Sequence, residues 1–592
     1  ASVILNILRS SSSSSPVCLI MTMEDVPWKE FAQKEDLTVR LSNILQDYAF
    51  GPGIFRELLQ NADDAGASRF ALYADSMHHE GHEEACMPVA KEDAHGLIDA
   101  RLASWQGPAI MAFNDALFSE DDFEGICRVG ASIKQSDHTK IGRYGLGFNA
   151  TYHLTDVVSF VSNDRLCIFD PHRCHLPSGL PGLQLLLTDA SRKQFAAQLQ
   201  PFNDVLNDAL VDSGSQSDDL CQAKTSGTVF RLPLRTETLA AKSSISKQAH
   251  TFQGVVSILS DFLAAAGEAL LFLQSVEDLE VHVREGKSWR SLGSAKIHAA
   301  CRATAAKLRK ERQMLKNLVE DKITQDRRTL RTGFAISFRL DGGAKVSNSA
   351  AESATNSATT SWLVVARAEP VDDQVVNSKD GSNLVPSNVP SFRLAAVGVP
   401  LWPWLRDDQQ TDTELSEERP AVKPSELALR DFRGQAYCFL PLSLKTGLPV
   451  HISANFALTA NRRDLWRRRD DQQSSESNLR ASWNEALLEK TCPRAYADAL
   501  ELLAAGLLQS APTQGKLPFK ADNFLPTEAS LELQDVWRHC RIWALWPRAS
   551  SSHFAEIPAR VSQELVARDA AVFHGEGEAS GVPVFHRAKF SL

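Results

Sequence analysis

The chain has 592 residues, of which 43% are hydrophobic and 23% are charged, and its formal net charge at pH 7 is −10. This length suffices for several hydrophobic cores, and at ~150 residues per domain it predicts about four domains. The negative net charge disfavours a nucleic acid as the main partner, because the phosphate backbone of a nucleic acid is also negative. No apolar run reaches the ~18 to 20 residues that span a bilayer, so no membrane partner is expected.

Residues 1–23 are expected to lie outside the fold. They contain no acidic residue and include an unbroken serine run at 10–15, which is typical of a leader or a non-native N-terminal segment. The alternative is a transit-peptide remnant, which would make the protein organellar. The ten cysteines occur singly, so reduced thiols and a cytoplasmic protein are expected, with a nuclear protein as an alternative.

Two helices are predicted next. Apolar residues from Leu37 to Tyr48 recur on one helical face. After a Gly-Pro-Gly break, the second helix carries Glu57, Asn61 and Asp64 at i, i+4 and i+7, which places all three on one face. An apolar stripe on another face contains Ile54, Leu58, Ala62 and Ala65. Such a helix suits a hydrated metal ion held against phosphates.

The pattern of apolar and polar residues predicts strands at 69–75 and 108–115. Residues 76–107 form a polar insertion between them, which we interpret as a loop. The alternative is a zinc site, although the spacing of its candidate ligands matches no closed site. Those ligands are His78, His79, His82, Glu83, Glu84 and Cys86. A further helix is predicted to begin after Ser119, with Asp122 three residues on.

A glycine-rich segment follows. Gly142, Gly145 and Gly147 allow backbone N–H groups to approach a polyphosphate, and the residues after Gly147 are predicted to start a helix. The polar residues 130–140 suit a lid over a nucleotide, from which Lys134 would reach the phosphates. Further strands are predicted at 157–162, 165–171 and 227–234.

The second half of the chain shows a different order of elements. Residues 241–325 are mainly helical in pattern, and 255–276 is predicted to be a buried or amphipathic helix. Strands are then predicted at 334–340, 392–405 and 435–460, and helices after about residue 480. Residues 342–360 are predicted to be a disordered insertion, and 372–391 another loop.

Together these segments resemble the GHKL ATPases, the superfamily of gyrase, the ninety-kilodalton heat-shock chaperone, histidine kinases and MutL. The closer resemblance is to the ATPase module of the sacsin and sacsin-repeat family. The segments that carry it are 33–38, 57–67, 113–118, 142–156, 449–453 and 460–466.

This resemblance implies an α+β fold with a defined domain order. An ATP-binding domain at residues 24–240 would have the Bergerat fold, a two-layer α/β sandwich with helices on one face of a mostly antiparallel sheet. A second, middle α/β domain would follow at 241–480, and a mainly helical segment of a longer chain at 481–592.

The resemblance also implies roles at the phosphate end of an ATP site. Glu57 would be the general base that activates the attacking water. Asn61 would coordinate Mg²⁺ and Asp64 would support the nucleotide through water. The glycine-rich loop would wrap the phosphates through Gly142, Gly145, Leu146, Gly147 and Phe148.

At the adenine end, the resemblance leaves two candidates open for reading the base, Asn114 and Asp115. Thr228 would bind adenine through a water. The chaperone's Asp-x-Gly-x-Gly strand ending is replaced here by Asn114-Asp115-Ala116-Leu117-Phe118. A basic residue from the following domain would contact the γ-phosphate, and Arg462 or Arg463 is the candidate.

The implied function is a slow, Mg²⁺-dependent ATPase that acts as a chaperone or co-chaperone in protein quality control. Its partners would be protein clients or other chaperones, and it would form a homodimer or act as a monomer. One alternative is a nucleotide-binding scaffold with little or no hydrolysis. A DNA-handling ATPase is a third hypothesis, which the net charge disfavours.

Overall fold

A computed structural model describes the chain at residues 35–47, 50–79, 96–127, 147–211, 227–284, 286, 288–297, 329–342, 357–371, 392–400, 432–459, 464–468, 475–509, 545–547, 553–576 and 583–587. The fold is mixed α/β. The described strands form one sheet of 14 strands and a separate two-stranded hairpin. Within these ranges, no helix has the length and apolar character needed to cross a bilayer.

The first part of the large sheet has the strand order β8-β7-β1-β2-β6-β3-β4-β5. Neighbouring strands are antiparallel except β1 and β7, which are parallel. The strands are β1 (Arg69–Asp75), β2 (Ala109–Asn114), β3 (Val158–Ser162), β4 (Arg165–Phe169), β5 (Gly182–Leu186), β6 (Thr228–Pro233), β7 (Asp278–Arg284) and β8 (Trp289–Ile297). The predicted strands in the first 240 residues are therefore confirmed.

Strands β7 and β8 correct the expectation that residues 241–325 are mainly helical. Leu279, Val281 and Val283 are buried at every second position of β7, which is the period of a strand. The helix predicted at 255–276 is confirmed as two short helices, α7 (Phe252–Ala264) and α8 (Ala266–Leu270). The parallel pairing of β7 with β1 joins this segment to the first part of the sheet.

Helices cover both faces of this first part. One core contains residues of α1 (Leu37–Asp47), α2 (Gly53–Asp64), α7 and α8. The other face packs on the 3₁₀ helix η1 (Ala100–Trp105), α5 (Ala196–Val211) and α6 (Glu237–Lys242). Two further helices are α3 (Glu120–Ile126), capped by Ser119 as predicted, and α4 (Asp189–Gln194). The resulting arrangement differs from a sandwich with helices on one face only.

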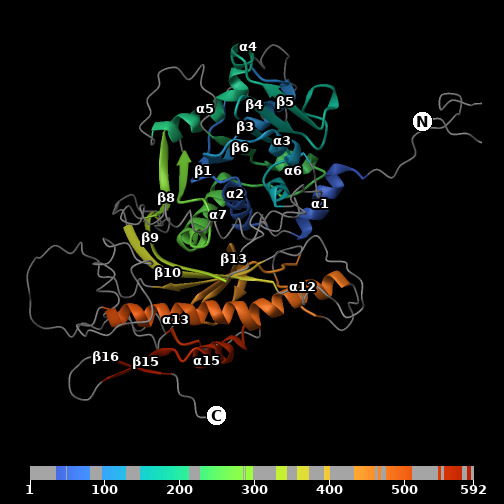
Figure 1. Cartoon of the computed structure of the whole chain (residues 1–592). Helices are drawn as coiled ribbons and strands as arrows, with labels where there is room; N and C mark the ends of the chain where they lie inside the picture. Colours follow the sequence, from blue (N-terminus) through green and yellow to red (C-terminus); the bar gives the residue numbers. More distant parts are fainter. Residues whose placement is uncertain are drawn as a thin grey trace, which may run out of the picture.

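The second part of the sheet continues through β9 in the order β13-β12-β14-β11-β10-β9. Its strands are β9 (Leu330–Gly342), β10 (Ser357–Pro370), β11 (Phe392–Pro400), β12 (Gln435–Cys438), β13 (Leu440–Lys445) and β14 (His451–Ala454). Helices α12 (Ser475–Ala486) and α13 (Cys492–Gln509) run beneath it in Figure 1, joined by a π-helical turn at Leu487–Thr491. Of the predicted insertion at 342–360, residues 343–356 lie outside the described residues, whereas 357–360 belong to β10.

Strand β10 separates two cores. Trp362 and Val364 belong to the core that contains α2, α7 and α8, whereas Leu363 and Val365 belong to the core that contains α13. Successive side chains of a strand point to opposite faces, so β10 is covered on both sides. In Figure 1, α2 and α7 accordingly lie between β1 and β10.

Helices α12, α13 and α15 (Ile557–Ala567) make up most of the regular structure described within 481–592, and a short hairpin is added to them. After α15, strands β15 (Ala571–Glu576) and β16 (Pro583–Arg587) pair as this antiparallel hairpin. The boundary expected between residues 240 and 241 stays a prediction. Residues of α7, α8, β7 and β8 share the core of α2.

A buried ion pair stabilises residues 152–156, which follow the glycine-rich loop. The guanidinium of Arg235, 0% exposed, donates to the Asp156 carboxylate. It also donates to the backbone carbonyls of Tyr152, His153 and Thr155 at 2.7, 2.8 and 3.0 Å. These carbonyls lie at and just after the 3₁₀ helix η3 (Phe148–His153), so one side chain fixes where that helix ends.

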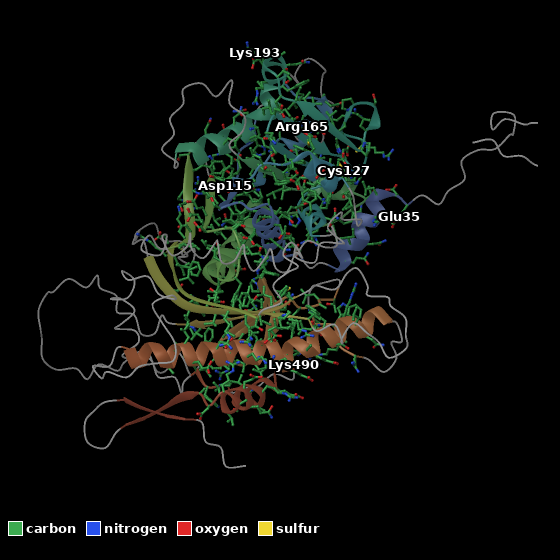
Figure 2. All side chains as sticks on the ribbon, in the orientation of Figure 1. Glu35, Asp115, Cys127, Arg165, Lys193 and Lys490 are labelled. Atoms are coloured by element: carbon green, nitrogen blue, oxygen red, sulfur yellow. The ribbon has the colours of Figure 1, made fainter. Side chains whose placement is uncertain are left out.

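Replacing this guanidinium should destabilise the fold. Arg235→Met leaves the buried Asp156 carboxylate without its partner, so we expect the free energy of unfolding to fall by about 3–5 kcal/mol. Urea unfolding measures the change, with Lys193→Met as control, since the Lys193 side chain is exposed (Figure 2) and lies far from Arg235 in sequence. Equal unfolding midpoints for the two variants would contradict a stabilising role for this ion pair.

Candidate functional site

Helix α2 presents the predicted acidic and amide face. Ile54, Leu58 and Ala62 are buried, as the apolar stripe predicts. Ala65 is exposed instead, because it caps the C-terminus of the helix. The three residues on the predicted polar face, Glu57, Asn61 and Asp64, are all half-buried. The helix therefore offers two carboxylates and an amide from a rigid element.

A neighbouring acid that the sequence analysis did not select holds α2 in place. The Asp63 carboxylate accepts backbone N–H bonds from Gln274, Ser275 and Val276 at 3.0, 2.6 and 3.0 Å. Asp63 is 2% exposed, so these bonds are shielded from water. They join the polar helix to the loop between α8 and β7. Periodicity could not reveal this anchor, because its partners lie more than 200 residues away in sequence.

The Glu57 carboxylate lies directly against Gly147. A Cβ atom built on Gly147 would be 2.0 Å from Glu57 Oε2 and 3.0 Å from Cδ. Gly147 has an ordinary helical conformation, with φ −60° and ψ −43°, and it precedes η3. The missing side chain therefore serves close approach, not an unusual backbone angle. Two segments that the sequence analysis singled out, the polar helix and the end of the glycine-rich loop, are thus in contact.

The residues after Gly147, where a helix is predicted to start, form the 3₁₀ helix η3. The centroid of the Phe148 ring lies 5.7 Å from that of Phe230 and 6.3 Å from that of Phe169, so the ring packs on strands β6 and β4 of the sheet. Burial raises the pKa of Tyr152 above its usual range, which keeps this phenol neutral. The segment beside Glu57 is consequently anchored by apolar contacts as well as by Arg235.

The predicted adenine-side residues Asn114 and Thr228 lie directly opposite each other in β2 and β6. Thr228 is 0% exposed, and its hydroxyl lies 2.8 Å from the Ala116 carbonyl and 2.7 Å from Ser162 Oγ. Directly opposed side chains of an antiparallel pair share one face of the sheet. The structure therefore brings these two residues together and adds Ser162, which the sequence analysis missed.

Asp115, the other candidate for reading the base, has a different environment. Its Oδ1 accepts N–H bonds from Ser68 and Arg69 at 2.8 and 3.0 Å, and its Oδ2 accepts from the Ser68 hydroxyl. Both carboxylate oxygens therefore bind the turn before β1. Asn114 uses its Oδ1 to accept a bond from Ala116 N at 3.1 Å. Between the two candidates, only Asn114 shares a cross-strand position with Thr228.

Several predicted site residues lie outside the described residues: Lys134, Gly142, Gly145, Leu146, Arg462 and Arg463. Their roles stay predictions.

Of the candidate ligands for the alternative zinc site at residues 76–107, the structure describes only His78 and His79. The His79 ring bonds to Asp75, whose carboxylate also pairs with Arg284. Although burial opposes it, bonding from His79 and Arg284 lowers the pKa of Asp75 to about 2, which marks this cluster as a buried ion pair network.

The donor set on α2 fits a hard cation. Carboxylate and amide oxygens are the protein ligands that Mg²⁺ prefers, and Mg²⁺ keeps several of its waters. The half-buried Asn61 and Asp64 supply such oxygens without closing the site. The Glu57 carboxylate beside the Gly147 backbone can accept a hydrogen bond from a water molecule and take its proton.

The close approach of Glu57 and Gly147 predicts a coupled effect on stability. Gly147→Ala should lower the free energy of unfolding by about 1 kcal/mol, because the added methyl group must displace the carboxylate. The loss should disappear in a Glu57→Ala background, which leaves room for the methyl group. A double-mutant cycle in urea measures this coupling. The control is Gly53→Ala, because a Cβ at Gly53 has no neighbour within 4 Å among the described atoms; additive effects of the two substitutions would contradict the contact.

Comparisons with known proteins find similarity to sacsin. The family model described as "Sacsin domain" matches residues 34–292, which include α2, η3 and the strands β1 to β7. A curated relative, Sacsin from Homo sapiens, is 26% identical over 82% of this chain. The chain spans only 11% of the length of that relative.

Proposed function

Because the chain is a sacsin-like protein, we propose that it binds Mg-ATP between α2 and the glycine-rich segment and hydrolyses it slowly. The observation that carries the proposal is the contact of the Glu57 carboxylate with Gly147. Glu57 lies on α2, the helix that also carries Asn61 and Asp64. A carboxylate, an amide and a glycine backbone in this order suit a water molecule, a metal ion and a phosphate chain.

Each residue has one role in the proposed reaction. Glu57 accepts a hydrogen bond from the attacking water, aligns it and takes its proton. The Asn61 side-chain oxygen holds Mg²⁺, with Asp64 supporting the hydrated ion through water. When bound, Mg²⁺ neutralises charge on the phosphates. Gly147 leaves its backbone open to the phosphate chain, since any side chain there would collide with Glu57.

At the other end of the site, we assign Asn114 and Thr228 to the adenine base. Their position across β2 and β6 supports this choice over Asp115, whose oxygens are occupied by Ser68 and Arg69. The residues outside the described ranges complete the proposal. Gly142, Gly145 and Leu146 would wrap the phosphates, Lys134 would contact them from a lid, and Arg462 or Arg463 would reach the γ-phosphate.

The shared core supports coupling of turnover to a change of shape. Helices α2, α7 and α8 pack on strands of both parts of the large sheet. A movement of α2 would therefore be transmitted to β10 and to β12, where Tyr437 belongs to the same core. We propose that the chain is a chaperone or co-chaperone in the cytoplasm, and that it uses this coupling to act on protein clients.

Substitution of the base separates binding from hydrolysis. Glu57→Ala should bind ATP with Mg²⁺ at close to the parental affinity, because the substitution removes no ligand of the nucleotide. Its steady-state turnover should fall by about 10²-fold or more, because no side chain then takes the proton of the water. Calorimetry and a phosphate-release assay measure the two quantities.

The exposed Glu237→Ala is the matched control, since it removes a carboxylate from the first turn of another helix. Parental turnover in Glu57→Ala would exclude the assigned base. Nucleotide binding without turnover in the parent would favour a nucleotide-binding scaffold instead. Absence of binding in the folded parent would overturn the proposal as a whole.

A further inference from the structure

A second cluster of chemically active side chains lies in the loop after β4, apart from the residues assigned to the nucleotide. Asp170, Cys174 and His175 each direct one ligand atom toward the others, and these three atoms lie within 4.8 Å of one another. We propose that this cluster is a zinc-binding site, with Asp170 Oδ1, Cys174 Sγ and His175 Nδ1 as ligands and water in the fourth position.

The separations between the ligand atoms suit a tetrahedral ion. His175 Nδ1 lies 3.4 Å from Cys174 Sγ and 3.1 Å from Asp170 Oδ1. Zinc binds sulfur at about 2.3 Å and nitrogen or oxygen at about 2.0–2.2 Å, so two ligands of a tetrahedral site are about 3.3–3.6 Å apart. The separation of His175 from Asp170 is slightly shorter than this range, and Cys174 Sγ also lies 3.6 Å from Nε2. Zinc binding would therefore require small movements of the exposed Cys174 and His175 side chains.

The carboxylate and the imidazole are held in position by groups outside the cluster. Asp170, which is 0% exposed, uses Oδ2 to accept N–H bonds from His175 and Leu176 at 2.6 and 3.2 Å, which leaves Oδ1 for the His175 ring. The His175 ring packs edge-on against Trp105, with centroids 5.5 Å apart. Support of this kind orients ligands in metal sites.

The donor set and the charge favour zinc over a hard cation. One thiolate and one imidazole are ligands that Mg²⁺ and Ca²⁺ avoid. A carboxylate and a thiolate together neutralise a divalent ion. The nearby Arg101 adds a positive charge, but its guanidinium pairs with Asp99 at 2.7 Å and donates to the Leu176 carbonyl. On binding, the Cys174 thiol releases its proton to solvent, the neutral His175 imidazole carries its proton on Nε2, and zinc replaces the bond between Nδ1 and Asp170.

Two other interpretations are weaker. A purely structural Asp170 would cap the loop through Oδ2 and hold the His175 ring through Oδ1, but neither bond requires a thiol beside the same ring nitrogen. A reactive thiol at Cys174 would need a lowered pKa. Burial, followed by the charge of Asp170, instead raises the pKa of the Cys174 thiol.

Zinc binding to the metal-free full-length chain tests the proposal. Equilibrium dialysis with ZnCl₂, followed by elemental analysis, should give one more zinc per parent chain than per Cys174→Ser chain, or at least about a tenfold weaker affinity in the variant. His175→Phe should have the same effect, because it keeps the ring packed on Trp105 and removes both nitrogens. Titration with Co²⁺ should show a thiolate-to-metal absorption band in the parent that both variants lose.

Cys127→Ser is the matched control, since it removes another exposed thiol whose Sγ contacts only a backbone carbonyl among the described groups. It should keep the parental zinc content. Circular dichroism and the thermal midpoint confirm that each variant is folded. The proposal is overturned if the folded parent takes up no zinc, or if Cys174→Ser and His175→Phe bind zinc with the parental stoichiometry and affinity.

Discussion

The close packing of helix α2 is the constraint on which the rest of the described structure depends. Its apolar side is buried in the core, and Asp63 binds three backbone N–H groups of the loop before β7. Its polar side brings Glu57 against Gly147. The helix can therefore neither rotate nor slide without losing buried hydrogen bonds or colliding with η3. A site built on such an element keeps its geometry without a bound ligand.

The same helix belongs to a core that serves two parts of one sheet. Strand β10 contributes Trp362 and Val364 to that core and Leu363 and Val365 to the core of α13. Phe272, just after α8, meets Tyr437 of β12 at 4.8 Å, edge to face. Packed cores resist continuous deformation, so strain at α2 would pass to the second part of the sheet as a shift of whole elements. This packing is a physical route by which a change at the proposed nucleotide site would reach the second part of the sheet.

Local patterns predicted much of the fold, and non-local contacts explain the rest. Strand β1 matches its predicted bounds, because alternation of side chains and flanking turn residues are visible in the sequence. Strands β7 and β8 were missed, because helical patterns around them dominated a long window. Family resemblance assigned Glu57 and the glycine-rich loop to the same end of an ATP site, but the contact of Glu57 with Gly147 is a finding of the structure. Asp63, Ser162 and Arg235 act through partners distant in sequence, so no local signal identifies them.

Donor chemistry distinguishes the two candidate sites. On α2, Asn61 and Asp64 offer only oxygen atoms, which suit a hydrated, hard cation that is exchanged together with a nucleotide. After β4, Cys174 and His175 add sulfur and nitrogen, which suit a resident, borderline-soft ion. The set after β4 would bind Mg²⁺ poorly, since Mg²⁺ avoids thiolates, and the set on α2 offers zinc neither the sulfur nor the nitrogen that favours it. A chain with both sets could therefore use one metal for turnover and another to fix a loop.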